Sequence, residues 1–476
     1  MTGQPSSSAP PVVPPLDDVD VPPVDPAGGG APARRRGLPK RRWLMLAMIF
    51  IVYAIAAADR TTMTITAPLI AKEFALTNTQ MGYVFSAFAL AYGIFAIPAG
   101  AIVDRLGAKV AILFGLVVWS AGTFVNGFAG MIFSAFGFLW VSRFVVGAAE
   151  AVVTPGGASI LATWFPDRER GRATSIWNSS TYITTAAVSP LMGWICQEYN
   201  WQAVFWIMGV GGLIAALFWV IGYYEPARDT RLSQGEFDYM VAGGALATAS
   251  APPGREPIDW ARKTAEVKFL LSQPSMLVIF FGQYCGNSIA GMLIGWMPIY
   301  LTRVHHFSVL DAGWFMSIGG IAAALAAIGG GYVIDFLYRR TGSMALSRKV
   351  PLTVGYLLAS TMVLLSYVTS PTAIAVLLFL LFLGKGWANS GWILVADTAP
   401  RSLVGTVGGL MNAVGAIGSV VTGIMIGVLV DRYQSFDLAL LYVGAHGIMA
   451  VIAFWLVFRK MERLQLTFDE SGEATV

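Results

Sequence analysis

The chain has 476 residues and a mean hydropathy of +0.65, with 56% hydrophobic and only 12% charged residues. An ordinary soluble domain carries about 25% charged residues. This composition therefore excludes a soluble globular protein and predicts one that crosses a membrane many times. The chain has two cysteines, Cys196 and Cys285, which exclude a disulfide framework and argue against a metal site built of cysteines.

The first 42 residues predict a cytoplasmic tail. Residues 1–33 are rich in Pro, Gly, Ser and Ala, a composition typical of disorder. A basic cluster over 34–42 then precedes a full-length apolar segment, which indicates a retained membrane anchor and not a cleaved signal peptide. We interpret the cluster as a topology signal, and contact with anionic lipid headgroups is the alternative.

Apolar segments long enough to cross a bilayer as helices of about 20 residues follow in chain order. They divide into an N-terminal bundle over 43–223 and a C-terminal bundle over 274–458, and residues 459–476 form a second cytoplasmic tail. A cytoplasmic loop over 224–273 separates the bundles and contains a short amphipathic helix in IDWARKTAEVKFLLSQ. The sequence thus predicts an all-α membrane protein with twelve transmembrane helices. The expected spans are 43–67, 79–103, 108–128, 135–159, 173–195, 201–222, 274–300, 311–334, 350–369, 372–396, 404–430 and 438–458.

Basic residues are distributed unevenly between the two sides of this arrangement. Most lie in the N-terminal tail, the loops on the same side as that tail, and the C-terminal tail, whereas the opposite loops hold Lys72, Arg303 and Arg432. The positive-inside rule then places both termini in the cytoplasm. The basic residues therefore report topology and give no reason to expect a nucleic-acid partner.

Charged residues inside the expected spans are the strongest functional signal. Asp59 and Arg60 lie in the first span, and Arg143 and Glu150 lie in the fourth. A charge at mid-bilayer costs roughly 2.5–3.5 kcal/mol, so such residues are paired, hydrated or functional. Arg143 and Glu150 are seven residues apart, so they share one helix face at about 10.5 Å along the axis.

We interpret the two acids as proton carriers and the two arginines as ligands for a substrate carboxylate. An apolar surrounding favours the neutral form of a carboxyl group and a nearby cation favours its ionised form, so such an acid can load and release a proton. The planar guanidinium of arginine binds a carboxylate through two parallel hydrogen bonds. The alternative is a structural charge network that locks spans one and four together.

Lys385 is a third cation at membrane depth, between Gly384 and Gly386. One interpretation is that it pairs with a second substrate carboxylate, which would favour a diacid. The other is that it extends toward the interface or bonds to a helix carbonyl.

The two halves of the chain repeat one loop pattern. GAIVDRLGAK joins spans two and three, and GYVIDFLYRR joins spans eight and nine. Likewise FPDRERGRA follows span four and TAPRSLVGT follows span ten. Such repeats are typical of secondary transporters, which bind substrate at midplane between the halves. We interpret the first pair of loops as a cytoplasmic latch, formed by Gly100, Asp104, Arg105, Gly107, Lys109 and Asp335.

Other chemistry finds no support in the sequence. It has no phosphate-binding loop, metal-ligand cluster or nucleophile triad, so neither enzymatic catalysis nor ATP-driven transport is expected. We expect no cofactor. The partners expected are a small organic anion, protons and the lipid bilayer.

The segment GAIVDRLGAK closely matches the loop motif of the major facilitator superfamily, and the chain resembles that superfamily from Trp43 to Phe458. Within it, ADRTTMTITAPLIAKEF, TWFPDRERGRATSIWNSSTY and LGKGWANSGWILVADTAP are similar to the bacterial anion:cation symporters that carry sugar acids such as hexuronate, galactonate and glucarate. The resemblance implies two pseudo-symmetric halves of six helices each.

The resemblance also implies roles for individual residues. It assigns proton coupling to Asp59 and Glu150, and carboxylate binding or pairing with those acids to Arg60 and Arg143. It places a further set of polar and aromatic side chains toward the substrate: Tyr92, Asn178, Thr181, Asn389, Trp392 and Asn412.

Departures from the family pattern bear on the substrate. Ala56, Ala57 and Ala58 stand where relatives often have Asn-Tyr and a further residue, Ala96 stands where many have Gln, and Thr181 also replaces a Gln. These changes remove groups that bind hydroxyls, so the substrate can be smaller or less polar than a sugar acid.

The sequence therefore predicts a proton-coupled symporter of the bacterial cytoplasmic membrane that imports an organic anion, a sugar acid or related carboxylate, and acts as a monomer. Three alternatives remain open. One is a transporter of an aromatic or small dicarboxylic acid, and another is an exporter or antiporter of the same fold. The third is a receptor built on a transporter scaffold, although such a receptor need not keep two protonatable acids at membrane depth.

Overall fold

A computed structural model describes residues 41–132, 134–247, 260–388, 391–400 and 403–458, with short pieces of the C-terminal tail at 463–465, 467–468 and 474–475. Side chains at 260–263, 392, 396 and in the tail beyond 465 are outside this description. The compact unit of the fold begins at Arg41.

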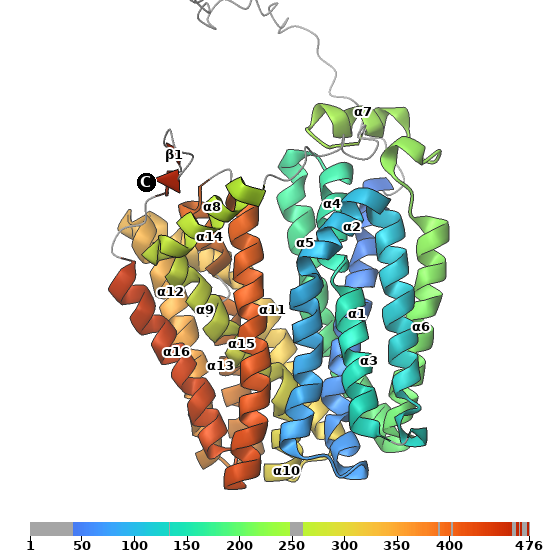
Figure 1. Cartoon of the computed structure of the whole chain (residues 1–476), viewed down its shortest axis with the longest axis vertical. Helices are drawn as coiled ribbons and strands as arrows, with labels where there is room; N and C mark the ends of the chain where they lie inside the picture. Colours follow the sequence, from blue (N-terminus) through green and yellow to red (C-terminus); the bar gives the residue numbers. More distant parts are fainter. Residues whose placement is uncertain are drawn as a thin grey trace, which may run out of the picture. The chain divides into compact units, whose positions relative to one another are not determined.

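The described residues are almost entirely helical (Figure 1). The N-terminal helices are α1 (Arg41–Glu73), α2 (Asn78–Asn126), η1 (Ala129–Met131), α3 (Ala135–Glu150), α4 (Val153–Trp164), α5 (Asp167–Glu198) and α6 (Trp201–Gly222). The connecting segment holds η2 (Pro226–Arg228), α7 (Gln234–Ala242) and α8 (Trp260–Ser272). The C-terminal elements are α9 (Pro274–Ala290), η3 (Gly291–Trp296), α10 (Met297–Val304), α11 (Val309–Thr341), α12 (Met344–Ser360), η4 (Thr361–Tyr367), α13 (Pro371–Ala388), α14 (Gly391–Thr398), α15 (Val404–Tyr433) and α16 (Asp437–Val457). Two short strands, β1 (Thr467–Phe468) and β2 (Ala474–Thr475), pair antiparallel in the tail.

Ten helical segments of the described chain are long and apolar enough to cross a membrane. One of them, α2, contains two spans, because Gly107 interrupts it with φ +80° and ψ 154°, a conformation that favours glycine. The 32-residue helix α5 adds another crossing, since at 1.5 Å per residue it is about 48 Å long. Its polar first turns, which begin at Asp167, lower its hydropathy. These segments account for the twelve predicted spans.

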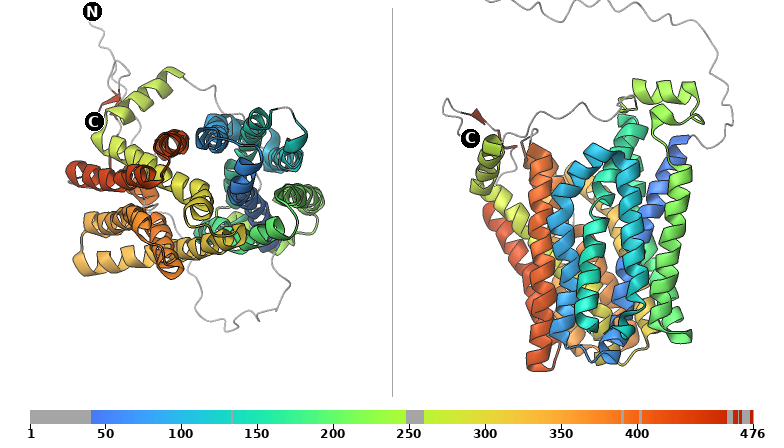
Figure 2. Two further views of the ribbon diagram at one scale, coloured as in Figure 1. Left: turned by 90° about the horizontal axis from the view of Figure 1, so that it is seen from below. Right: turned by 45° about the vertical axis from the view of Figure 1, so that its right-hand side comes forward.

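The helices form two groups. Helices α1 to α6, coloured blue to green, lie together, and α9 to α16, coloured yellow to red, lie together (Figure 1). The view along the helices in Figure 2 separates the same groups. We call them the N-bundle (41–222) and the C-bundle (274–457).

The two ends of the bundles differ in how the bundles meet. We call the end that carries the starts of α1, α5, α9 and α15 the basic end, and the opposite end the distal end. Near the distal end the Ser86 hydroxyl of α2 donates to the Val420 carbonyl of α15 at 3.0 Å. On the other side, the Ser317 hydroxyl of α11 donates to the Ala186 carbonyl of α5 at 2.6 Å. The helix pairs α2–α15 and α5–α11 are therefore in contact there.

Toward the basic end the same helix pairs separate. A Cβ built at Gly100 of α2, or at Gly405 and Gly409 of α15, would meet no heavy atom within 4 Å. The same holds for Gly331 on α11 and Gly171 on α5. Gly100 and Gly331, which begin the two repeated loop segments, therefore make no close helix contact in this structure. The bundles are closed at the distal end and apart at the basic end.

Helix α7 docks on the basic end of the N-bundle, a contact that the sequence did not reveal. The Glu236 carboxylate accepts from the backbone N–H groups of both Arg41 and Arg42, and from Arg42 Nη1 at 2.8 Å. Arg42 also pairs with Glu169 at the start of α5, and Arg41 with Asp229. The carboxylate of α7 thus satisfies donors at the start of α1.

Candidate functional site

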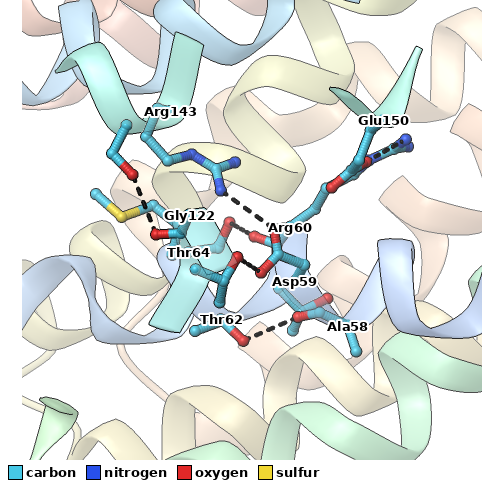
Figure 3. Close-up of polar contacts among 12 residues, drawn as sticks. Ala58, Asp59, Arg60, Thr62, Thr64, Gly122, Arg143 and Glu150 are labelled. Atoms are coloured by element: carbon cyan, nitrogen blue, oxygen red, sulfur yellow. Dashed lines mark hydrogen bonds and ion pairs between the residues drawn. The ribbon is translucent and has the colours of Figure 1, made fainter. Parts of the chain in front are cut away.

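Asp59 and Arg60 lie in the middle of α1, where a helical rotation of about 100° per residue turns them toward different neighbours. Figure 3 shows Arg60 turned toward Glu150 and Arg143 turned toward Asp59. The two acid–base pairs therefore cross between α1 and α3. Each acid pairs with an arginine of the other helix.

The first pair is short and reaches an accessible space. Arg60 Nε donates to Glu150 Oε2 at 2.8 Å, and Arg60 Nη2 lies 2.8 Å from the same oxygen. Glu150 is fully buried, whereas the Arg60 side chain is 30% exposed. Among the described residues, Glu150 Oε1 has no hydrogen-bond partner. The pair thus uses one carboxylate oxygen and leaves part of the guanidinium open.

The second pair is longer and closed. Arg143 Nη1 lies 3.6 Å from Asp59 Oδ2, beyond ordinary hydrogen-bond distance, and both side chains are almost fully buried. The Thr123 hydroxyl of α2 donates to the other oxygen of Asp59. Asp59 is therefore held by one hydroxyl and one guanidinium, and its side chain is almost fully buried.

Aromatic rings of α2 lie between the two guanidinium groups. The ring of Phe88 has the Arg143 guanidinium 4.8 Å from its centroid and that of Arg60 at 5.2 Å. Tyr92 lies 5.4 Å from the Arg60 guanidinium, and its hydroxyl is 2.8 Å from Thr154 Oγ1. Cation–π contacts of this kind contribute roughly 0.5–2 kcal/mol each. The rings hold both cations in place without neutralising them.

The backbone of α2 and α3 approaches closely at this level. A Cβ at Gly147 of α3 would lie 2.5 Å from the Phe88 carbonyl oxygen, so only glycine permits this packing. One turn later α3 ends at Glu150, and α4 begins at Val153. Pro155 lacks the N–H that would bond to the Ala151 carbonyl, which explains the break. Glu150 thus lies where helical hydrogen bonding is interrupted, although Ala151 and Val152 keep helical backbone angles.

The structure places one of the other predicted site residues beside the two ion pairs, and the remaining ones lie on other helices or outside the described residues. Tyr92 lies beside Arg60, as described. Thr181 is half-buried on α5, whereas Asn178 on α5 and Asn412 on α15 are exposed. Lys385 is half-buried on α13. Asn389 lies outside the described residues, and so does the side chain of Trp392.

Residues of the predicted latch lie within the separate bundles in this structure. Gly107 supplies the left-handed turn between the two spans of α2, and the Lys109 ammonium lies 3.9 Å from the ring centroid of Tyr224, beyond α6. Arg105 and Asp335 are exposed, and Asp104 is partly buried. A latch that closes the basic end would have to re-form when the bundles approach.

Sequence reasoning did not identify Phe88 and Thr123. Thr123 carried a weak signal, because it is a hydroxyl in an apolar span. Phe88 carried none, since aromatic residues are common in such spans. Among the described residues, no group of three or more His, Cys, Asp or Glu side chains could hold a metal ion.

Comparison with known proteins supplies independent information. Residues 49–423 match the family model described as Major Facilitator Superfamily. The chain is 38% identical over 429 residues to the probable galactarate/D-glucarate transporter GudP of Escherichia coli (strain K12), covering 90% of this chain and 95% of that protein. It is 32% identical to a D-galactonate transporter of Escherichia coli O6:H1, covering 89% of this chain and 97% of the relative.

Solved structures match the fold. An inward-facing, occupied bacterial homologue of the human lysosomal transporter Spinster aligns with a TM-score of 0.68 at 18% identity, covering 89% of this chain and 98% of that one. A POT family transporter aligns with a TM-score of 0.66 at 14% identity, covering 87% and 96%. At these identities the likeness concerns the fold alone.

Proposed function

The chain belongs to the major facilitator superfamily, and we propose that it imports a sugar acid together with protons by alternating access. It is a multi-pass membrane protein with the all-α fold of these transporters. The names of its relatives support a sugar acid, because galactarate, glucarate and galactonate are all polyhydroxylated carboxylates. Transport, not catalysis, is the activity proposed.

One observation supports coupling most strongly: the accessible cation is bound to a buried acid. Ionised Glu150 forms an ion pair with Arg60, in which Glu150 Oε2 lies 2.8 Å from Arg60 Nη2. Protonation removes the negative charge of Glu150, and the guanidinium can then bind a substrate carboxylate with two hydrogen bonds. Proton and substrate thereby favour each other's binding, and this linkage couples their movement.

Asp59 and Arg143 form a second pair of the same composition. Asp59 is proposed as a second proton carrier, and Arg143 as its partner and a second carboxylate ligand. Because this pair is closed in the present structure, its proton exchange requires the other access state. The Arg60–Glu150 and Arg143–Asp59 pairs together fit a transport cycle in which protons and substrate enter from one side of the membrane and leave to the other.

The separation of the bundles at one end indicates which side of the membrane the open end of the transporter faces. The basic end carries most of the Lys and Arg, so it is proposed to face the cytoplasm with both termini. Among the described residues, the contacts that join the bundles run from the distal end to the level of Gly93 and Ala416, and none is made at Gly100. The described state is therefore proposed to be inward-facing. Bacterial relatives indicate the cytoplasmic membrane, and the monomer is the proposed unit.

The alternative of a smaller or aromatic diacid rested on five residues that replace hydroxyl-binding groups: Ala56, Ala57, Ala58, Ala96 and Thr181. The three alanines of α1 are buried, whereas Ala96 and Thr181 are partly exposed. Burial of the α1 alanines removes part of the basis for this alternative.

Uptake into proteoliposomes tests the proposal. A one-unit inward pH gradient drives about tenfold accumulation per coupled proton, so wild-type protein should concentrate galactarate or glucarate at acidic external pH. Glu150→Gln should abolish this accumulation but keep exchange across equal concentrations. Glu198→Gln, the same change at an exposed position on α5, is the matched control. Accumulation that survives in Glu150→Gln would contradict the proposed role of Glu150.

A further inference from the structure

Lys385 is a cation at membrane depth that the proposed mechanism does not use. It lies in the last turn of α13 and is half-buried. Its ammonium makes no hydrogen bond or ion pair with any residue that the structure describes, unlike Arg60 and Arg143, whose charges are both paired. An unpaired ammonium at this depth is costly unless it binds something.

The face of α13 on which Lys385 lies points into the protein. Ile374, Leu378 and Leu381 precede it at helical spacing, and all three are fully buried. Val376, on the opposite face, is 53% exposed. Lys385 continues the buried face toward the basic end, where the bundles are apart, so its partial exposure is to the interior space and not to lipid.

The internal repeat gives the depth of Lys385. FPDRERGRA and TAPRSLVGT occupy equivalent places after the fourth and tenth spans, so Pro166 corresponds to Pro400. Glu150 precedes Pro166 by 16 residues, and Lys385 precedes Pro400 by 15. One residue is about 1.5 Å along a helix. Lys385 therefore lies at nearly the same depth as Glu150, the partner of Arg60, but in the other bundle.

Close packing fixes the position of Lys385. A Cβ at Gly384 would lie 2.6 Å from the Gly355 carbonyl oxygen of α12, and one at Gly386 would lie 2.3 Å from the Ala326 Cβ of α11. The two glycines thus allow α13 to pack tightly against both neighbours. The lysine between them is presented on a rigid helix, as a recognition group requires.

We propose that Lys385 binds the second carboxylate of a dicarboxylate sugar acid whose first carboxylate is bound by Arg60. This inference rests on the proposed function. Protonation of Glu150 leaves two unpaired cations, Arg60 and Lys385, one in each bundle. A diacid neutralises both and bridges the bundles, whereas a monoacid leaves one cation unpaired. Lys385 is therefore a specificity residue that selects aldarates over aldonates.

Ligand binding to the purified full-length protein tests the inference at a pH where the substrate is ionised. Galactarate and galactonate have the same carbon chain and differ in having two carboxylates or one. A hydrogen bond to a charged group corresponds to roughly ten- to hundredfold in affinity. Lys385→Met should therefore weaken galactarate binding roughly ten- to hundredfold and change galactonate binding less than about twofold. Lys385→Arg should restore most of the galactarate affinity.

The controls separate this inference from the proposed function. Lys72→Met removes a lysine charge from an exposed position at the distal end and should change neither affinity. The unfolding temperature without ligand should show that Lys385→Met is folded, and Lys385→Gln is a second variant if it is not. Equal losses for both ligands, or no loss for galactarate, would overturn the inference about Lys385. Failure of the wild-type protein to bind either acid would overturn the proposed function itself.

Discussion

Asp431 joins the two bundles at the distal end, and its removal should open that end. Its carboxylate accepts from the backbone N–H of Asn78 at 3.0 Å and from that of Thr79 at 2.7 Å, at the start of α2. It also accepts from Asn78 Nδ2 at 2.8 Å and from the Thr79 hydroxyl at 2.6 Å. Arg303 of α10 donates to the Asn78 side-chain oxygen. A C-bundle carboxylate thus satisfies the start of an N-bundle helix.

The hydrogen bonds give the size of the effect. A net intramolecular hydrogen bond contributes about 0.5–1.5 kcal/mol, and an anion at a helix start adds about 0.3–1 kcal/mol. Because Asp431 is partly exposed, water replaces much of what is lost. We therefore expect Asp431→Ala to destabilise the distal closure by about 1–3 kcal/mol, which corresponds to a roughly 5- to 150-fold shift between the two access states.

Spin-label distance measurement across the distal end would detect this shift. Labels at Tyr83 on α2 and Leu438 on α16, both exposed, report the separation of the bundles once the two native cysteines are replaced. Asp431→Ala should add a population at longer distance. Asp437→Ala, an exposed acid at the same end, should not. An unchanged distance distribution in Asp431→Ala would refute the reasoning.

Three further variants test the charge pairs and the helix joints through thermal unfolding of the purified protein. Arg143→Met should destabilise the protein by about 3–5 kcal/mol, because it leaves Asp59 without its cation. The double variant with Asp59→Asn should recover most of that loss. Equal unfolding temperatures for the single and double variants would argue against the pair. Gly107→Ala should cost about 1–2 kcal/mol at its φ of +80°, and no change would show that the turn relaxes. Glu236→Ala should cost about 1–3 kcal/mol by releasing the donors of Arg41 and Arg42, whereas an unaffected variant would mean that α7 is held by other contacts.

Much of the fold followed from the sequence, because hydropathy and loop charge report membrane spans directly. The family resemblance and the all-α fold are confirmed by the comparisons. The places where helices break inside the membrane were harder to predict. The end of α3 at Glu150 depends on Pro155, and a proline in a span indicates a kink without fixing where it falls.

The charged residues at membrane depth show a different limit of prediction from sequence. Helical spacing placed Arg143 and Glu150 on one face, and that spacing holds within α3 and its last turn. Their partners on α1 could not be deduced, because periodicity gives the direction of a side chain and not the helix that it meets. The crossed pairs of Arg60 with Glu150 and Arg143 with Asp59 depend on how two helices are rotated against each other.

Contacts made by loops and helix ends were missed for a related reason. The sequence analysis did not single out Asp431, because its partners lie on α2, far away in the sequence. The docking of α7 through Glu236 has the same origin. Such contacts follow from tertiary packing, which one sequence does not specify.

The movement of protons with substrate tests the central claim most directly. Wild-type protein in proteoliposomes, with equal pH on both sides and a pH-sensitive dye outside, should alkalinise the external medium when galactarate is added. The double variant Asp59→Asn and Glu150→Gln should admit no substrate-driven protons. If galactarate entered the proteoliposomes with no accompanying change in external pH, buried carboxyl groups would not couple proton movement to transport.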